Sequence, residues 1–361
     1  MRMCMPGEVK PKSGFTFHLN QFMAYSSTSG PRGASRLTGP GMWMLTFDSD
    51  LASWNRLSID VMGSPEQLTV GDRGTPQLLQ TEHIDNMHAH DTIMALEFRD
   101  VVKLGGGDQQ LTLLFAPRGE AAAGPVPFMH RESAEGNPDA PLGHTLQDGF
   151  HDVSTVLGAE YRFGRTTLAA TAFSGQDIRW PFPLHGPDSY GVRVTQVIDD
   201  HLGVGASYAD VLSPNDAGGS EHNHFVSAWL TTSHRIGGAT LKSSFIWGQA
   251  RDSHAPVRNS FLAEAAYQWG RNRLFGRAEA LQITPEQLDL VTVNGAEPRW
   301  VEALTVGYER ALVQRDNVSL LVGGSVTVDA LPPVFQPAYG NDPRGVKGYV
   351  RVKLMSAGPG S

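Results

Sequence analysis

The sequence predicts an all-β protein, a transmembrane antiparallel β-barrel of about sixteen strands with short periplasmic turns and long extracellular loops. Three observations predict this fold class. Segments of alternating apolar and polar residues recur along the 361-residue chain, short connections alternate with long ones, and 40 glycines and 23 prolines interrupt the chain throughout. Frequent glycine and proline favour many short strands over helices.

The alternating segments have the two-residue period of strands. In residues 15–25, for example, Phe15, Phe17 and Leu19 alternate with polar residues. Most segments span about nine to twelve residues, whereas a strand of a soluble protein usually has about five or six. The predicted strands are residues 15–25, 41–48, 54–62, 92–102, 110–116, 152–163, 166–174, 189–198, 202–212, 223–234, 239–250, 258–269, 272–283, 299–311, 316–329 and 345–354.

The connections between these segments carry the strongest argument. Short links lie at 49–53, 164–165, 199–201, 235–238, 270–272 and 313–316. Long links lie near 26–40, 64–91, 117–149, 175–188, 213–221, 251–257, 284–297 and 330–344. Short turns on one rim and long loops on the other are typical of a transmembrane barrel.

The side-chain pattern adds a polar lumen. In residues 153–163 we expect the odd-numbered residues, Thr155 included, to face lipid and Ser154 to face inward. Charged side chains are tolerated inside such a barrel, while Lys or Arg at the lipid midplane costs about 2–4 kcal/mol. The charged residues predicted to line the pore are Glu97, Arg99, Glu160, Arg162, Arg193, Lys242, Glu264, Arg277, Glu279, Lys347, Arg351 and Lys353.

Aromatic residues near the ends of the predicted strands indicate interfacial girdles. They are Trp43, Trp54, Tyr161, Phe163, Tyr190, Trp247, Tyr267, Trp269, Trp300 and Tyr308. Filling of an ordinary core is the alternative explanation. Residues 223–234 and 299–311 fit the inside/outside pattern less well, since Glu302 interrupts the apolar face of the second segment.

Composition limits the partners. The net charge of -8 leaves no basic stripe to neutralise phosphates, so nucleic acid is not an expected partner. Cys4 is the only cysteine, which excludes an intrachain disulfide. The first ten residues do not resemble a signal peptide, so an exported protein would have lost its signal from this sequence. We predict an N-terminal periplasmic segment at 1–13, one barrel at 14–354 and a C-terminal tail at 355–361.

A barrel of about sixteen strands is too wide for side chains alone to fill. The long loops at 64–91 and 117–149 are therefore the candidate constrictions of the lumen. Their glycine, proline and asparagine residues favour defined turns.

Histidines concentrate in these two loops. Six of the thirteen lie between Thr81 and Asp152. Imidazole and carboxylate are ligands for copper or zinc. Structural histidines that lock the loops and pH gating of the lumen are the alternatives. The candidate metal ligands are His83, His88, His90, Asp91, His130, His144 and His151, and Met1, Met3, Cys4 and Met5 form a separate soft cluster suited to Cu(I).

Several segments together resemble one family of bacterial outer-membrane barrel proteins, often encountered beside metal-resistance or respiratory genes. They are GPRGASRLTGPGMWML, GTPQLLQTEHIDNMHAHD, DSYGVRV and PFMHRESAEGNPDAPLGHTLQDGFHDVS, which contains the characteristic HRxSAxxNPxAPLGH string. The resemblance covers most of the chain and implies a porin-like barrel in the outer membrane. Family members commonly carry His-Pro-His-Asp where this chain has residues 88–91, and a paired histidine where it has His144 and Thr145. The threonine removes one potential metal ligand.

A hydrolase is the competing class, because Ser154 follows His151 and Asp152 closely. No G-x-S-x-G elbow marks a nucleophile, and haem, Walker and dinucleotide motifs are absent from the sequence, so we expect no enzyme activity. The predicted function is a channel or porin-like conduit for small solutes or ions. The alternatives are copper or zinc binding or export, and a barrel that sheathes a partner such as a cytochrome. Outer-membrane lipid is the expected surrounding, and a periplasmic partner protein or a homo-oligomer is compatible with this interpretation.

Overall fold

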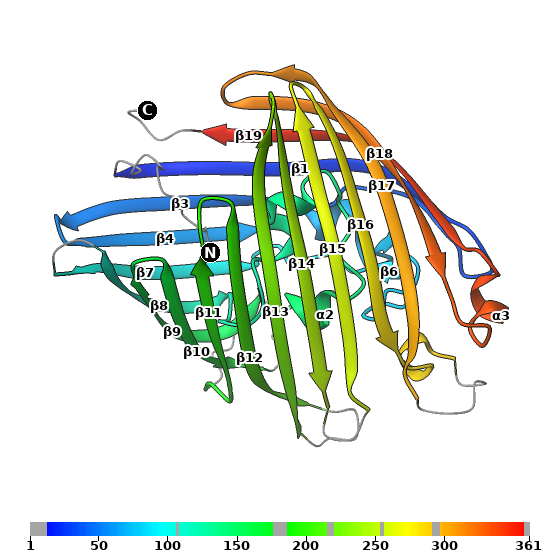
Figure 1. Ribbon diagram of the computed structural model, residues 1–361, viewed down its shortest axis with the longest axis horizontal. Coiled ribbons are helices and arrows are strands. Elements are labelled where there is room, and N and C mark those ends of the chain that lie inside the picture. Colours follow the sequence, from blue (N-terminus) through cyan, green and yellow to red (C-terminus); the bar gives the residue numbers. More distant parts are fainter. Residues whose placement is uncertain are drawn as a thin grey trace.

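The computed structural model describes residues 13–105, 108–175, 186–214, 220–252, 256–290 and 297–356. They form a closed antiparallel β-barrel with segments of chain inside it (Figure 1). Leaving out the four-residue strand β2 (Ser35–Thr38), the main sheet of this described part contains sixteen strands. The predicted fold class is therefore confirmed.

Each strand pairs with its neighbour in the chain, and β1 pairs with β19 to close the barrel. The register of that closure places Phe22 opposite Arg351. The sixteen strands are β1 (Gly14–Thr28), β3 (Gly41–Ala52), β4 (Asn55–Gly63), β7 (Ala95–Leu104), β8 (Gln109–Gly119), β9 (Val153–Phe163), β10 (Thr166–Ser174), β11 (Ser189–Val197), β12 (Leu202–Pro214), β13 (Ser220–Ile236), β14 (Ala239–Arg251), β15 (Arg258–Trp269), β16 (Asn272–Ile283), β17 (Arg299–Gln314), β18 (Val318–Ala330) and β19 (Arg344–Ser356).

The outer face of the barrel is apolar. Along β17, buried and exposed residues alternate over thirteen positions, with Leu304 and Val306 exposed and Val301 buried. Every backbone group of a closed sheet is paired, so a wall of this kind can face lipid. Glu302 does point outward, but it lies near the strand's end, three residues after Arg299.

Aromatic pairs lie near both rims. Tyr267 and Trp269 (ring centroids 5.4 Å apart) end β15 beside a short turn, and Trp269 also contacts Tyr308. At the opposite end, Phe261 stacks on Trp300 with 5.9 Å between centroids. This is the arrangement of interfacial girdles.

Tight turns join the strands at one rim. Gly164, Gly237 and Gly270 have φ values of 56°, 62° and 54°, which hairpin turns of this kind require. One predicted orientation is wrong: Thr155 is buried rather than facing lipid, because it has a positive φ of 51° beside a register shift between β9 and β10.

Longer loops join the strands at the other rim; the loops at 64–91 and 120–152 fold into the barrel, whereas the loop at 331–343 stays at the rim (Figure 1). They contain the short strands β5 (Thr75–Pro76) and β6 (Asn86–Met87), the helices α1 (Glu66–Thr69), α2 (His144–Gln147) and α3 (Gln336–Tyr339), and single 3-10 turns at Phe128–His130, Glu132–Ala134 and Glu286–Leu288. An apolar cluster joins these loops to the inner wall through Leu79, Leu146, Ile283, Leu288 and Phe335. Within the described ranges, no helix is long and apolar enough to cross a membrane.

Candidate functional site in the barrel lumen

The connection between β8 and β9, residues 120–152, lies inside the barrel and is here called the inner loop. Arg131 is its central anchor. The Arg131 Nε donates to Glu264 Oε1 on β15 at 2.5 Å, and its guanidinium also pairs with Asp148 of the same loop. Ser133 Oγ adds a hydrogen bond of 2.8 Å to Glu264. Burial by itself would raise the pKa of Asp148, but the charges of Arg131 and His144 lower it below its ordinary value.

The next residues of the inner loop are bound to the wall formed by β16 and β19. Tyr349 donates its hydroxyl proton to the carbonyl oxygen of Gly136 at 2.6 Å. Asp139 pairs with Lys347. Glu135 faces three cations of the wall, Arg273, Arg351 and Lys353.

The start of the inner loop is bound to β7, β11 and β12. The Glu120 carboxylate pairs with Arg193 at 2.9 Å, and the Glu120 N–H donates to Glu97. Gly124 N–H donates to Ser207 Oγ at 2.7 Å. The loop is therefore held by polar contacts on several sides of the lumen.

The charged residues predicted to line the pore lie on inward-facing positions, and most contact the inner loop. Lys242 pairs with Glu132, and Glu279 accepts a hydrogen bond of 2.6 Å from the Leu142 N–H. Arg99 instead pairs with Glu97 and Asp60, and Arg162 hydrogen-bonds Gln110. That these residues line a conducting path stays a prediction.

Two pockets lie between the inner loop and the wall. The β18 pocket is enclosed by β1, β16 to β19, residues 76–78 and part of the inner loop. The β10 pocket is enclosed by β7 to β11 and the start of the inner loop, and Arg99, Glu120, Glu160 and Arg193 line it.

Five of the predicted histidines form a row of neighbouring imidazole rings. The centroid distances are 5.5 Å between His83 and His88, 5.5 Å between His88 and His90, 5.8 Å between His90 and His151, and 5.0 Å between His151 and His144. We call this arrangement the histidine row. It unites the loop at 64–91 with the end of the inner loop.

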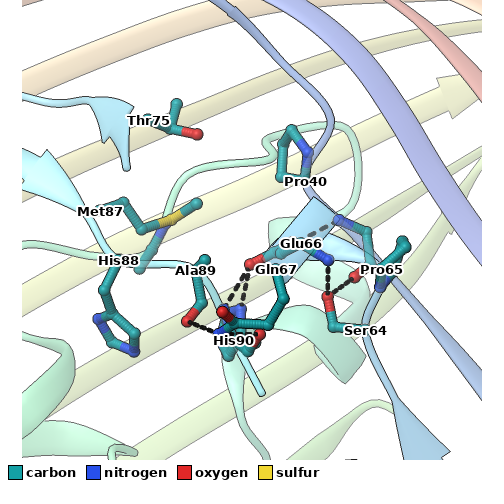
Figure 2. Close-up of polar contacts among 12 residues, drawn as sticks. Pro40, Ser64, Pro65, Glu66, Gln67, Thr75, Met87, His88, Ala89 and His90 are labelled. Atoms are coloured by element: carbon teal, nitrogen blue, oxygen red, sulfur yellow. Dashed lines mark hydrogen bonds and ion pairs between the residues drawn. The ribbon is translucent and has the colours of Figure 1, made fainter. Parts of the chain in front are cut away.

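Carboxylates bind individual rings of the row. Glu66 Oε2 lies 2.8 Å from both the Nδ1 and the backbone nitrogen of His90 (Figure 2). Burial alone would lower the pKa of His90, but the charge of Glu66 raises it to about 9, and the pKa of Glu66 is lowered in turn. The His88 Nδ1 lies 2.5 Å from Glu82, which raises the pKa of His88 despite its burial.

The far end of the row differs. Burial lowers the pKa of His151 to about 4, and its Nδ1 lies 3.3 Å from the carbonyl oxygen of Asp148. His144 Nδ1 lies 2.6 Å from the Asp148 carboxylate. At neutral pH the row therefore joins a protonated His90 to a neutral His151.

Two predicted ligands lie outside the row. His130 Nε2 is 3.2 Å from the sulfur of Met62, and burial lowers the pKa of His130 to about 3. Asp91 accepts a hydrogen bond of 2.5 Å from Arg118. Across the residues that the structure describes, no three His, Cys, Asp or Glu side chains are arranged to hold a metal ion. The cluster at Met1, Met3, Cys4 and Met5 lies outside the described residues.

The residues considered for a hydrolase do not form a triad. The buried Ser154 Oγ has no hydrogen-bond partner within the ranges that the structure describes, and the Nδ1 of His151 lies near a backbone carbonyl. Asp152 pairs with Arg118 at 3.1 Å. A nucleophilic serine needs a base within hydrogen-bond reach.

Sequence analysis missed several residues of this site. They include Glu66, which is 24 positions from His90, and Arg131, which is 133 positions from Glu264, a residue predicted to line the pore. No spacing rule links either pair. The sequence offers one signal for Arg131: it is a charged residue inside a loop that is rich in proline and glycine.

No protein-family model and no curated protein sequence matches the chain. Solved structures do share its fold. Similar ones are Salmonella typhi OmpF in complex with daunomycin (TM-score 0.57, 10% identity, covering 97% of this chain and 99% of that chain) and the anion-selective porin from Comamonas acidovorans (0.56, 11%, 95% and 98%). A third is Pseudomonas putida OprB (0.55, 10%, 95% and 94%). The chain thus has the porin-like β-barrel fold of these outer-membrane proteins.

Proposed function

We propose that the chain is a narrow channel of the bacterial outer membrane that conducts small polar solutes or ions. The apolar outer wall, the aromatic pairs at both rims and the porin-like fold support the location. The observation that carries the channel function is the position of the inner loop, which is bound to the wall by polar contacts and still leaves two polar pockets beside it. Charged side chains that face these pockets would set which solute passes.

Single-channel conductance in planar lipid bilayers tests this proposal. We expect small, discrete conductance steps from the purified protein. A variant in which residues 128–142 are replaced by a short Gly-Ser linker should give larger steps, because the narrowest part of the lumen is removed. If the wild-type protein gives no conductance steps and the linker variant does conduct, the inner loop is a plug and the proposal is overturned. Loss of steps in both proteins would overturn it as well.

We also propose copper or zinc binding by the histidine row as a second candidate function. Two imidazoles that share one tetrahedral metal ion, with metal–nitrogen bonds of about 2.0–2.1 Å, have ring centres about 5 Å apart, close to the spacing in the row. The carboxylates on the Nδ1 atoms of His88 and His90 resemble the outer-shell partners that orient metal-binding imidazoles. Binding would require side-chain rotation, since the ligands are not arranged for a metal in the described residues.

Elemental analysis of untagged protein, purified without chelator, tests the second candidate. We expect stoichiometric copper or zinc that is lost when His88→Ala and His90→Ala are combined. The matched control combines His201→Ala and His234→Ala, an exposed pair of rings 5.3 Å apart. Metal-free wild-type protein, or equal loss in both double variants, would reject it.

The third interpretation, a barrel that sheathes a partner such as a cytochrome, gains no support. The inner loop occupies the part of the lumen that an enclosed partner would need.

A further inference from the structure

The β18 pocket has an unusual balance of charge. Lys347 and Arg277 are the cations that line it. Lys347 is bound by Asp139. Arg277 is bound by Glu264, and its Nη1 donates to the carbonyl oxygen of Asp139 at 2.8 Å. Both cations therefore have anionic partners within the protein, although Arg277 Nη2 makes no hydrogen bond to a described residue.

Two further carboxyl groups, Glu279 and Asp329, line the same pocket and form no ion pair with a described residue. One oxygen of Glu279 accepts the Leu142 N–H at 2.6 Å. The Asp329 side chain, 5% exposed, forms neither an ion pair nor a side-chain hydrogen bond with any residue that the structure describes. Asp329 is thus a buried carboxyl group of the pocket that no cation of the described residues pairs with.

Two residues that line the pocket have buried acceptors without a partner among the described residues. Ser26, which is 1% exposed, lines the pocket from β1, and its Oγ has no hydrogen-bond partner in the described part of the chain. Gln77 Oε1 likewise lacks a partner among the described residues, while its Nε2 donates to the carbonyl oxygen of Ala140 at 2.7 Å. Buried polar atoms are normally satisfied by protein or by ordered water, so these acceptors are available to a ligand that supplies hydrogen-bond donors.

The chemistry of these groups selects the ligand. Among the described residues that line the pocket, the groups without a hydrogen-bond partner are the Asp329 carboxylate, one oxygen of Glu279, Gln77 Oε1 and Ser26 Oγ, against one donor, Arg277 Nη2. Acceptors therefore predominate, and they select a ligand that supplies positive charge and hydrogen-bond donors. A bound metal ion would need several ligands at short range, and the described residues contain no group of three arranged in that way. A planar guanidinium or a primary ammonium group carries several N–H donors and pairs well with carboxylates.

We propose that the β18 pocket is a binding site for a small organic cation bearing several N–H donors. The role of this pocket in transport rests on the proposed channel function. If the pocket lies on the path of the solute, small organic cations are the class of solute that the channel favours. Asp329 and Glu279 supply the charge, and Ser26 and Gln77 accept further hydrogen bonds from the cation.

Isothermal titration calorimetry of the full-length protein in detergent tests this site without requiring conduction. The probes are methylguanidinium, which has five N–H donors, and tetramethylammonium, which has the same charge and no donor. We expect methylguanidinium to bind about tenfold more tightly than tetramethylammonium or better, since a charge-assisted hydrogen bond is worth a factor of this order. Asp329→Asn and Ser26→Ala should each weaken methylguanidinium binding, and Glu302→Gln on the outer face should not.

Equal binding of the two probes, or unchanged binding in Asp329→Asn and Ser26→Ala, would overturn the site. Heat-modifiable migration in gels shows whether each variant is folded, and the milder Ser26→Ala change keeps the test available if Asp329→Asn fails to fold. The outcome is independent of the channel. A protein that binds methylguanidinium but gives no conductance steps rejects the channel alone, and a protein that conducts without binding it rejects this site alone.

Discussion

The β18 pocket and the β10 pocket adjoin the same inner loop, yet they differ in charge. Two arginines and two glutamates line the β10 pocket, and the loop itself supplies Glu120 as the partner of Arg193. In the β18 pocket the loop's Asp139 neutralises Lys347, and Asp329 is left without a partner among the described residues. One inserted loop can therefore give the two sides of a barrel interior different electrostatic character.

The largest expected effect comes from the anchor that holds the loop between these pockets. Arg131→Met would leave Glu264 and Asp148 buried without their partner. We expect the free energy of unfolding, measured by urea titration, to fall by about 3–5 kcal/mol, the usual cost of breaking a buried ion pair.

The control for this prediction is Arg56→Met, which breaks a pair with the exposed Asp50 and should cost about 0–1 kcal/mol. Equal losses in the two variants would contradict the anchoring role of Arg131.

A smaller effect is expected from the loop at 64–91, which contributes to the β18 pocket and not to the β10 pocket. Glu66 raises the pKa of His90 to about 9 from an ordinary value of 6.5. The stabilisation by the protonated His90 is therefore complete below about pH 6.5 and is lost as the pH rises through about 9. The pKa of Glu66 is lowered in the folded protein. The stabilisation by its ionised carboxylate is therefore complete above the ordinary pKa of a glutamate, and it is lost as the pH falls through the lowered pKa.

Because the pair of His90 and Glu66 loses its charge interaction at high pH, we expect the free energy of unfolding to fall by about 2 kcal/mol between pH 6 and pH 10. In Glu66→Gln that part of the pH dependence should disappear. Urea titrations of both proteins at the two pH values measure the difference, and an identical pH profile would exclude the proposed coupling.

The smallest expected effects concern ion selectivity, and they have opposite signs in the two pockets. Asp329→Asn should reduce cation preference and Arg193→Met should increase it. A unit charge about 7 Å from a permeating ion in water contributes about 0.6 kcal/mol, so each change should alter the permeability ratio by about twofold to threefold. Reversal potentials in a salt gradient give the ratio. Shifts of the same sign would mean that the two pockets do not act separately.

The fold was largely accessible from the sequence. The sixteen predicted strands match the sixteen long strands of the described chain, and differ mainly at their ends, as with β13, which extends from Ser220 to Ile236. Thr155 was misplaced because a bulge, which no two-residue pattern reveals, reverses its orientation.

The candidate site was accessible only in part. The histidines of residues 81–152 were singled out by their number, and five of them do lie in one row. Their partner Glu66 was missed, as were the orphaned acceptors Ser26 and Gln77, because nothing local distinguishes these residues from other polar residues of a strand or loop.

The strands, the short and long rims and the polar interior follow from the amino-acid pattern alone, because strand periodicity and turn residues are local properties. The path of the inner loop into the barrel and the charges that it neutralises depend on long-range contacts. Pairs such as Arg131 with Glu264 join residues 133 positions apart, and closing the barrel is what brings them into contact.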